Sequence, residues 1–429
     1  MDTRHIALMI IAGVLQAHQP LDTILEINRE FRALDNRDKA FVRMIVSTVL
    51  RRLGQIDALI ARAHDRKKQI DPPLLLNILR LGVAQIIFMN VPDHASVDTS
   101  VELAKVSGLE KAAGFVNGVL RNITKSHEDW LPEIDAVALN VAEWMFDQWV
   151  EDYGIDDAES IGQACLTEAP LDISVKNNDI AEEWARKLEA RVMPNGTLRR
   201  LEGGIVETLP GYEDGMWWVQ DMAAALPVAV FGDVKGMRVL DLCAAPGGKT
   251  TQLAARGATV LAVDRSARRL ERMNQNMKRL RLNGRVECVT ADAAVWSPVE
   301  TFDAILLDAP CTATGTIRRN PDIMYMKTLM DCEKLVTIQR RLLEHAVTML
   351  NPGGVLVYCN CSLQKAEGED QIDWLNSCGI PVVRKPIKKE EFPELSFIVT
   401  PQGDIRTRPD YLSRDGGMDG FFITRLVRV

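Results

Sequence analysis

Apolar residues recur every three to four positions through the first 130 residues of the chain. In Arg37–Leu53 this spacing places four apolar side chains on one side of a helix: Phe41, Ile45, Val46 and Val49. The stretches 72–89 and 97–124 show the same spacing, and the turn sequence NVPDHAS separates them. The pattern predicts an all-helical domain over residues 1–130.

After residue 231 the pattern changes to short apolar runs separated by helical segments. Five of these runs read MRVLDLC, TVLAVD, VECVTAD, FDAILLDAP and VLVYCNC. Strands that alternate with helices in this way are typical of a doubly wound parallel sheet. The final run, FFITRLVRV, predicts a further strand, and SFIVTP is a candidate to pair nearby. We therefore expect a sheet domain over residues 231–429.

A third kind of pattern occupies residues 136–230. Helices are expected near Asn140–Asp152 and Ile180–Ala190, and short strands near Leu171–Val175 and Gly204–Glu207. This predicts a mixed α/β segment that leads into the sheet domain.

The composition is that of a soluble globular protein. Of the 429 residues 47% are apolar and 26% are charged, and no apolar run is long enough to span a bilayer. No small-residue cleavage site follows MDTRHIALMIIAGVL, so a first helix is expected there and not a signal peptide. The eight cysteines are scattered, and the six histidines form no metal-binding spacing. A reducing cytoplasm and no metal site are expected.

The net charge of −8 argues against general affinity for nucleic acid, but the charge is unevenly distributed. Residues 1–130 carry 17 Lys or Arg and 15 Asp or Glu. Basic side chains cluster in this part at Arg51, Arg52, Arg62, Arg66, Lys67 and Lys68. Such clusters are either solvated helix ends or contacts for RNA phosphates.

The segment Asp241–Thr251, DLCAAPGGKTT, joins a predicted strand to a helix through a Gly-rich turn. Glycines let the backbone approach a ligand, and the helix N-terminus offers free N–H groups. A phosphate P-loop needs Gly six residues before Lys249, where this chain has Cys243. The dinucleotide fingerprint is absent as well.

Four aspartates end successive predicted strands: Asp241, Asp264, Asp292 and Asp308. Open parallel sheets bind ligands at the carboxyl ends of their strands. Asp264 lies 23 residues after Asp241, a position suited to a ribose diol, and Asp292 could accept a bond from an adenine amine. Each aspartate alone could be a helix cap or a turn residue, but four in succession favour a binding site.

Two cysteines, Cys311 and Cys361, follow strands at the same predicted edge. An isolated Cys is usually a small buried residue, which is how we interpret Cys165, Cys288, Cys332 and Cys378. If the ligand is a methyl donor and the acceptor a cytosine, a thiolate that adds to carbon 6 activates carbon 5. Asp308 and Cys311 supply an acid and a thiol on one turn. Chemistry alone does not choose between the two thiols, and analogy to DNA cytosine-C5 enzymes would favour Cys311.

Three of these segments, DLCAAPGGKTT, LLDAPCTATG and NCSLQKAEGEDQI, resemble the signature segments of the RNA cytosine-C5 methyltransferases, which use S-adenosyl-L-methionine. MDGFFITRLVR resembles their terminal strand and VQDMAAALP their lead-in segment. RDKAFVRMIVSTVLRRL and GFVNGVLRNI resemble the helical RNA-binding domain related to the antitermination factor NusB. That fusion is characteristic of the bacterial 16S rRNA cytosine-C5 methyltransferases of the Sun or Fmu type. The resemblance covers nearly the whole chain.

The resemblance implies a fold and a set of site residues. The fold is an all-α NusB-like domain followed by a class I, Rossmann-like methyltransferase domain with a mostly parallel seven-stranded sheet. The methionine part of the cofactor is held by a turn made of Cys243, Ala244, Ala245, Pro246, Gly247, Gly248 and Lys249. Asp264 is implied to bind the ribose, Asp292 to lie beside the adenine, and Asp308 to lie near both the methyl group and the target base.

For the thiols the resemblance reverses the choice suggested by the DNA enzymes. It implies that Cys361 is the nucleophile of a covalent Cys–C6 adduct and that Cys311 assists product release. Cys359 matches a position where the family needs no thiol, and we expect it to pack on the same face of its strand as Cys361. Two departures stand out: Asn360 replaces the usual Thr, and Glu367–Asp370 reads EGED where Glu-Glu-Asn is common.

The expected activity is methyl transfer to carbon 5 of one cytosine in 16S rRNA, either naked or in an early assembly intermediate. Residues 136–230 are expected to contact RNA as well. No obligatory protein partner and no membrane association are expected. RNA contacts are expected at Arg51, Arg52, Arg66, Lys67, Lys68, Arg318 and Arg319. Two alternatives stay open: the same chemistry on tRNA or DNA, and a non-catalytic RNA-binding protein with a relic methyltransferase fold.

Overall fold

The computed structural model describes residues 2–64, 69–201 and 204–429. They form two compact units. Unit 1 consists of residues 1–168 and 317–327, and unit 2 of residues 169–316 and 328–429. Each unit is described by itself. Among the described residues, no helix combines the length and the apolar character needed to cross a membrane.

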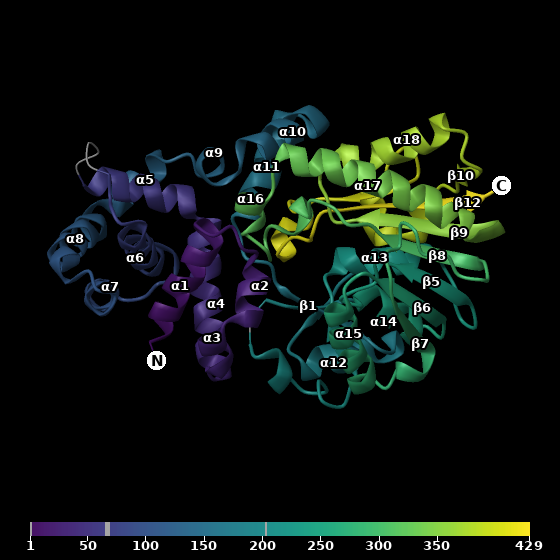
Figure 1. Ribbon diagram of the computed structural model, residues 1–429, viewed down its shortest axis with the longest axis horizontal. Helices are drawn as coiled ribbons and strands as arrows, with labels where there is room; N and C mark the ends of the chain where they lie inside the picture. The colour runs from purple at the N-terminus through teal and green to yellow at the C-terminus, as the bar shows by residue number, and fades with distance from the viewer. Residues whose placement is uncertain (1, 65–68, 202–203) are drawn as a thin grey trace. The chain divides into compact units, whose positions relative to one another are not determined.

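Unit 1 is all-helical in the part that the structure describes, as the sequence predicts (Figure 1). Its α-helices are α1 (Thr3–Leu15), α2 (Leu21–Ile27), α3 (Arg29–Ala33), α4 (Asn36–Arg51), α5 (Leu53–Ala63), α6 (Pro73–Val83), α7 (Asp93–Val106), α8 (Ala113–Trp130), α9 (Ala136–Asn140), α10 (Glu143–Tyr153), α11 (Ile155–Cys165) and α16 (Ile323–Met326). A π-helical turn, Ala84–Phe88, continues α6.

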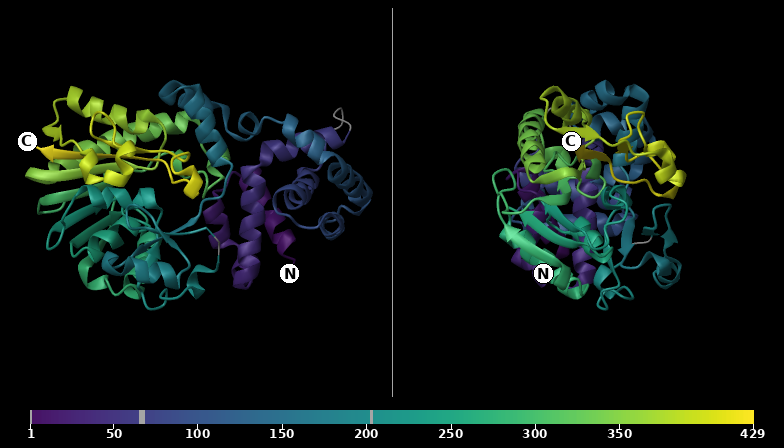
Figure 2. Two further views of the ribbon diagram at one scale, coloured as in Figure 1. Left: turned by 180° about the vertical axis from the view of Figure 1, so that it is seen from behind. Right: turned by 90° about the vertical axis from the view of Figure 1, so that its right-hand side faces the viewer.

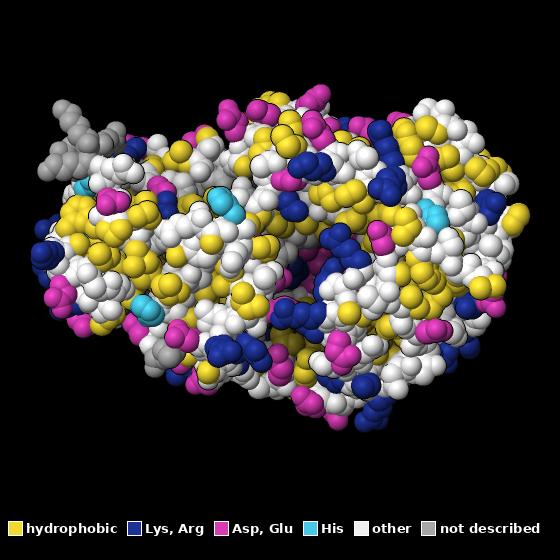
Figure 3. Space-filling model, in the orientation of Figure 1, with side chains coloured by type: hydrophobic (Ala, Val, Ile, Leu, Met, Phe, Trp, Pro, Cys, Tyr) yellow, Lys and Arg dark blue, Asp and Glu magenta, His cyan; other side chains and the backbone are white. Residues whose placement is uncertain are grey.

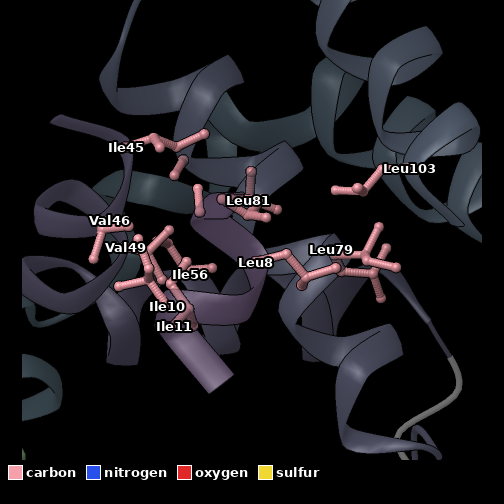
Figure 4. Packing of buried hydrophobic residues seen from close by; sticks show 14 of the residues in the cluster. Leu8, Ile10, Ile11, Ile45, Val46, Val49, Ile56, Leu79, Leu81 and Leu103 are labelled. Carbon is pink, nitrogen blue, oxygen red and sulfur yellow. The ribbon is translucent and has the colours of Figure 1, made fainter. Parts of the chain in front are cut away.

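Helix α4 carries the apolar stripe expected from the sequence. Ile45, Val46 and Val49 are fully buried, and Phe41 is half-buried against the same cluster. They pack with residues of α1 and α5 (Figure 4). The side chain of Asp35 accepts a hydrogen bond from the backbone N–H of Asp38 at 2.8 Å and so caps the helix. The stripe thereby joins α4 to the hydrophobic core of the unit.

The stretch 97–124, which shows helical spacing, is divided between two helices, α7 and α8. Gly108 follows α7 with a φ of 77°, and its N–H donates to Lys105 O at 3.0 Å. The N–H of Leu109 donates to Ala104 O at 2.9 Å. These two bonds close the helix in the manner of a Schellman motif, which a glycine in the left-handed conformation permits.

Residues 317–327 belong to unit 1 although they follow the Cys311 turn. The Tyr325 hydroxyl donates to Leu50 O at 2.6 Å, and the Trp144 indole N–H donates to Lys327 O at 3.1 Å. The Asp322 carboxylate accepts from the N–H of Leu21 at 3.0 Å. The apolar pattern of the sequence did not indicate this excursion.

Unit 2 begins with a small antiparallel sheet in the order β2-β3-β1-β4. Its strands are β1 (Leu171–Val175), β2 (Arg191–Val192), β3 (Leu198–Arg200) and β4 (Trp217–Val219), and α12 (Ala181–Lys187) packs against them. The prediction of a strand over Gly204–Glu207 is wrong. A 3-10 turn, Val206–Thr208, stands there, because Thr208 N–H donates to Ile205 O and not to a neighbouring strand.

A larger sheet follows in the order β10-β12-β9-β8-β5-β6-β7, and a short strand, β11, pairs with β12. Its strands are β5 (Arg238–Leu242), β6 (Thr259–Asp264), β7 (Val286–Thr290), β8 (Phe302–Asp308), β9 (Leu350–Asn360), β10 (Val382–Arg384), β11 (Ile405–Thr407) and β12 (Phe421–Arg428). Five neighbours, β7, β6, β5, β8 and β9, run parallel, and β12 is antiparallel to β9. This is the predicted Rossmann-like sheet, mostly parallel and with seven strands along its path.

Helices cover both faces of this sheet, which explains why its strands are almost continuously apolar (Figures 1 and 2). One buried cluster joins the strands to α13 (Met222–Val230), α14 (Gly248–Ala255) and α15 (Ala267–Arg279). The other joins them to α17 (Leu329–Thr348) and α18 (Glu369–Ser377). The carboxyl ends of β5, β6, β8 and β9 therefore lie at one edge, where the predicted site residues occur.

The segment SFIVTP does not form the strand that we considered. Residues 396–398 lie in a 3-10 helix, Pro393–Ile398, and Val399 makes only an isolated bridge with Ile405. The neighbour of β12 on this side is β11, whose register pairs Arg406 with Phe422.

Candidate active site

The turn between β5 and α14 has the backbone geometry of a close-approach site. Cys243 and Gly247 both adopt positive φ values, 61° and 99°. A Cβ atom on Gly247 would lie 2.3 Å from Cγ of Met273, so only glycine fits there. Helix α14 begins directly after this glycine and directs its free N–H groups at the turn.

Asp264, at the end of β6, is tied to the same turn. Its carboxylate accepts from the N–H of Ala245 at 3.1 Å and from the N–H of Ser266 at 2.8 Å. Asp292 is exposed after β7, and its carboxylate accepts from the N–H of Ala294 at 2.9 Å. The assignments of Asp264 to a ribose and of Asp292 to an adenine stay predictions.

Asp241 lies fully buried beneath the turn. One of its oxygens accepts a hydrogen bond from the Thr250 hydroxyl at 2.5 Å, and the other has no partner among the described residues. Burial raises the pKa of Asp241 to about 7, although the bond from Thr250 opposes the shift. A glycine cradle above a buried acceptor without a partner fits a small ligand that carries a hydrogen-bond donor.

Lys249 and Asp308 form an ion pair at the carboxyl ends of β5 and β8. Lys249 Nζ lies 2.7 Å from Asp308 Oδ2 and 5.0 Å from the centre of the Phe421 ring. Burial is the largest single effect and lowers the pKa of Lys249. The charge of Asp308, the hydrogen bond to Asp308 and the effects of Cys359 and Cys361 together outweigh burial, so the net shift is upward. Lys249 therefore stays protonated at neutral pH. A cation at a helix N-terminus opposes the helix dipole, and here the Asp308 carboxylate compensates it.

The two candidate thiols, of Cys311 and Cys361, are in contact. Cys311 Sγ and Cys361 Sγ lie 3.5 Å apart, because β8 and β9 are parallel neighbours and each thiol follows the end of its strand. The pKa of Cys311 is well above its ordinary value. The causes are its hydrogen bond to Cys361, burial, and the negative charges of Cys361 and Glu367. Cys311 therefore holds its proton and can donate it toward Cys361.

Cys359 is a third thiol near this place, and it is fully buried in the core between the sheet and α13–α15. It pairs with Asp308 in the register of β8 and β9, and its Sγ lies 3.5 Å from Asp308 Oδ1. Burial raises the pKa of Cys359 well above its ordinary value, and the charge of Asp308 raises it further. A buried thiol that keeps its proton suits packing beside the site.

Glu367 is a buried carboxylate that the sequence did not single out as a positioning group. It accepts from the backbone N–H of Thr312 at 3.0 Å, from the Thr312 hydroxyl at 2.5 Å and from the Gln339 side chain at 2.9 Å. Thr312 directly follows Cys311 in the chain. Glu367 thus fixes the turn that carries Cys311. Only its place in the acidic segment after Cys361 hinted at this role.

Asn360, which stands where the family usually has Thr, directly precedes Cys361 and bonds to residues that follow it. Its amide N–H donates to Glu367 O at 2.6 Å, and its amide oxygen accepts from the N–H of Ser362 at 3.0 Å. Tyr358 OH also donates to Glu367 O, at 2.6 Å. The Asn360 side chain therefore ties the end of β9 to the backbone that follows Cys361.

The residues predicted to contact RNA differ in how far they are exposed. Arg51 and Arg318 are buried, and Arg51 donates to Arg318 O at 2.9 Å, so neither offers a surface contact and the expectation is corrected for these two. Arg52 donates to Leu166 O at 2.8 Å. Arg319 is half-buried. Three others, Arg66, Lys67 and Lys68, lie outside the described residues.

Two solved structures have a similar fold. The structure of PH0851 matches over 99% of both chains with a TM-score of 0.76 and 23% identity. NSun6 from Pyrococcus horikoshii with SFG matches 67% of this chain and 98% of its own, with a TM-score of 0.57 and 21% identity. At these identities the likeness concerns the fold.

Comparison with proteins of similar sequence identifies the family of the chain. A "Ribosomal RNA small subunit methyltransferase B" from Xylella fastidiosa (strain Temecula1) is 32% identical over 99% of this chain and 97% of its own length. The protein of the same name from Pasteurella multocida is 30% identical over 100% and 96%. Residues 1–125 match the NusB family, and residues 229–427 match the family described as 16S rRNA methyltransferase RsmB/F. The chain belongs to this RsmB/F family of 16S rRNA methyltransferases.

Proposed function

We propose that the chain methylates carbon 5 of one cytosine in 16S rRNA through a covalent adduct with Cys361. The observation that carries the proposal is the contact of the Cys311 and Cys361 thiols, 3.5 Å apart, at the same sheet edge as the Lys249–Asp308 pair. The family membership and the printed name of the relatives support rRNA as the substrate class.

The cofactor is S-adenosyl-L-methionine, as in the family. The residues present fit it: the Gly247 cradle and the unpartnered oxygen of Asp241 suit a small ligand with a donor group. Residues Cys243–Lys249 would hold its methionine part, Asp264 its ribose and Asp292 its adenine. When bound there, it supplies an electrophilic methyl group.

The thiolate of Cys361 bonds to carbon 6 of the cytosine, and the electron pair of the 5,6 double bond moves to carbon 5. Carbon 5 would then bond to the methyl group that the cofactor supplies, and the electron pair of the broken carbon–sulfur bond would stay on the donor's sulfur. Asp308, which forms the ion pair with Lys249, receives a hydrogen bond from the exocyclic amine of the base. A base then removes the proton on carbon 5, the double bond re-forms, and the thiolate of Cys361 leaves.

Cys311 is proposed as that base. Its pKa is raised first of all by its hydrogen bond with Cys361. Once the sulfur of Cys361 is bonded to carbon 6, it carries no charge and accepts this bond poorly. The principal cause of the raised pKa is thereby removed, and Cys311 can lose its proton to solvent and then accept the proton from carbon 5.

The proposal also assigns a role to each of three parts of the chain. Residues 1–130 act as a NusB-like RNA-binding domain, residues 136–230 as an intermediate RNA-binding and lead-in domain, and residues 231–429 as the catalytic domain. The substrate is 16S rRNA alone or in an early assembly intermediate. The chain works in the cytoplasm without an obligatory protein partner.

The test is a comparison of RNA from cells that have and lack this chain. We expect one 5-methylcytosine to disappear from 16S rRNA and to return when purified chain and S-adenosyl-L-methionine are added to that rRNA. Loss confined to tRNA would contradict the rRNA assignment. Binding of the cofactor without methylation of any RNA would favour the non-catalytic alternative.

Exchange of Glu367 for Gln is expected to slow methyl transfer about 10- to 100-fold, the effect of losing one or two buried hydrogen bonds of about 1–3 kcal/mol. The Thr312 hydroxyl loses its charged acceptor, and the turn that carries Cys311 loosens. Because the charge of Glu367 raises the pKa of Cys311, its removal lowers that pKa. Single-turnover rates measure the first effect. The pH dependence of Cys311 alkylation in a Cys361→Ala background measures the second.

Glu369→Gln is the matched control for that exchange, because Glu369 lies in the same acidic segment but pairs with Arg406. We expect its alkylation profile to equal that of the parent. An unshifted profile in Glu367→Gln would contradict a positioning role for this carboxylate, even if the variant were less active.

A further inference from the structure

A cavity of about 220 Å³ lies in unit 2 apart from the thiols and the cofactor turn. Its walls come from β1 and the turn after it, the loop before β3, and the C-terminal half of α14. None of the residues assigned to cofactor binding or thiol chemistry lines it. The proposed function therefore leaves the cavity unexplained.

The lining consists largely of amide and hydroxyl groups: Ser174, Asn177, Asn178, Asn195, Thr197 and Gln252. Bonds to the protein fix several of them in place. The Asn195 amide donates to Met222 O at 2.9 Å, the Gln252 amide donates to Ala225 O at 2.9 Å, and the Ser174 hydroxyl donates to the Gln220 side chain at 2.9 Å. The amide oxygens of Asn195 and Gln252 also accept, from the Thr197 N–H and from the Gln220 amide, each at 3.2 Å. A side-chain amide has two N–H donors and two lone pairs, so a second donor and a second lone pair can meet the edge of an unstacked RNA base.

Positive charge surrounds the cavity. Lys176 and Arg256 line it. The pKa of Lys176 is lowered by burial and then by the nearby charges of Arg281 and Arg279. Asp179 is the one carboxylate among the described lining residues. Cations placed this close repel one another, and an anionic ligand would offset that repulsion.

The basic character extends along α15. Residues 265–285 contain eight Lys or Arg and one acidic residue, in a chain whose net charge is −8. Lys and Arg side chains gather in Figure 3 around the place where Figure 1 labels α15. A basic stretch of this kind in an acidic chain is the electrostatic footprint expected for a polyanion.

Helix α14 links this cavity to the cofactor turn. Its N-terminus follows Gly247, and its last turn supplies Ala255 to the cavity wall. Eight residues at 1.5 Å each put the two sites roughly 12 Å apart along the helix. The same RNA strand could reach both.

We propose that this cavity and its basic rim bind one nucleotide of the RNA substrate other than the target cytosine. The base enters the amide-lined cavity, and the adjacent phosphates lie against Lys176 and Arg281. The inference rests on the proposed function, since it assumes that RNA is the substrate.

The test is a Lys176→Ala/Arg281→Ala double variant of the full chain, titrated with 16S rRNA at several salt concentrations. We expect about 10-fold weaker binding. The slope of log K against log salt should fall by about 1.4, at about 0.7 for each lost phosphate contact to single-stranded RNA. With saturating rRNA, kcat should be unchanged while KM rises, because neither residue touches the reacting groups.

A Lys334→Ala/Arg341→Ala variant is the matched control, because it removes the same two charges from exposed positions of α17. Parental affinity and salt slope are expected for it. If the Lys176/Arg281 variant behaves like this control, the inference is overturned. Competition by polyglutamate as strong as by RNA of equal charge would also overturn it, in favour of an acidic peptide. Methylation by the parent chain tests the proposed function separately.

Discussion

Cys361→Ala is expected to lose methyl transfer by at least about 10⁴-fold, as is usual when the nucleophile of a covalent mechanism is removed. Neither neighbouring thiol can replace it. Cys359 is fully buried with a raised pKa, and Cys311 lies on the turn after β8, where its sulfur is 3.5 Å from the position of the Cys361 sulfur. RNA with 5-fluorocytosine at the target should give a covalent complex with the parent chain and none with this variant. Denaturing gel electrophoresis measures the complex.

The Cys311→Ala variant should show the opposite behaviour. It retains the nucleophile but lacks the proposed base, so an adduct with ordinary cytosine RNA should accumulate. Cys359→Ala is the matched control, since it removes a thiol from the same strand end, and we expect activity close to that of the parent. The assignment fails if Cys361→Ala still forms the complex, or if Cys359→Ala is as inactive as Cys361→Ala.

The large sheet could be predicted because each of its strands is recognisable from its own residues. Each is a short apolar run, and the helices between them force a parallel order. That order brings the ends of β8 and β9 together, so the proximity of Asp308, Cys311 and Cys361 follows from the sequence pattern. What the pattern could not supply is the distance between the thiols, which depends on how two turns are held.

Those turns are held by bonds between residues far apart in the chain. Glu367 reaches Thr312 across 55 residues and Gln339 across 28, and no periodicity predicts such pairs. The burial of Arg51 and Arg318 could not be predicted from the sequence for a related reason. Arg51 and Arg318 are charged in the sequence but buried in unit 1, where Arg318 O accepts from Arg51. Composition gives the charge of a side chain and not its exposure.

Asp308→Asn is expected to reduce the single-turnover rate of methyl transfer by about 10²- to 10⁴-fold, because it removes the proposed acceptor for the cytosine amine. It also leaves the ammonium group of Lys249, whose side chain is 10% exposed, without its ion-pair partner. Loss of a bonded partner for a buried group costs about 1–3 kcal/mol, and more when the group is charged. Urea unfolding of the parent and variant measures this loss.

Lys249→Met and the Lys249→Met/Asp308→Asn double variant separate the two effects. The double variant has no unpaired charge, so it should be more stable than Asp308→Asn alone while remaining as inactive. Lys249→Met should lose less stability than Asp308→Asn, since the Asp308 side chain is 30% exposed and can be solvated. If the double variant is no more stable than Asp308→Asn, the pair is not coupled as described. If it regains methyl transfer, Asp308 acts only by neutralising Lys249, and its contact with the target base is refuted.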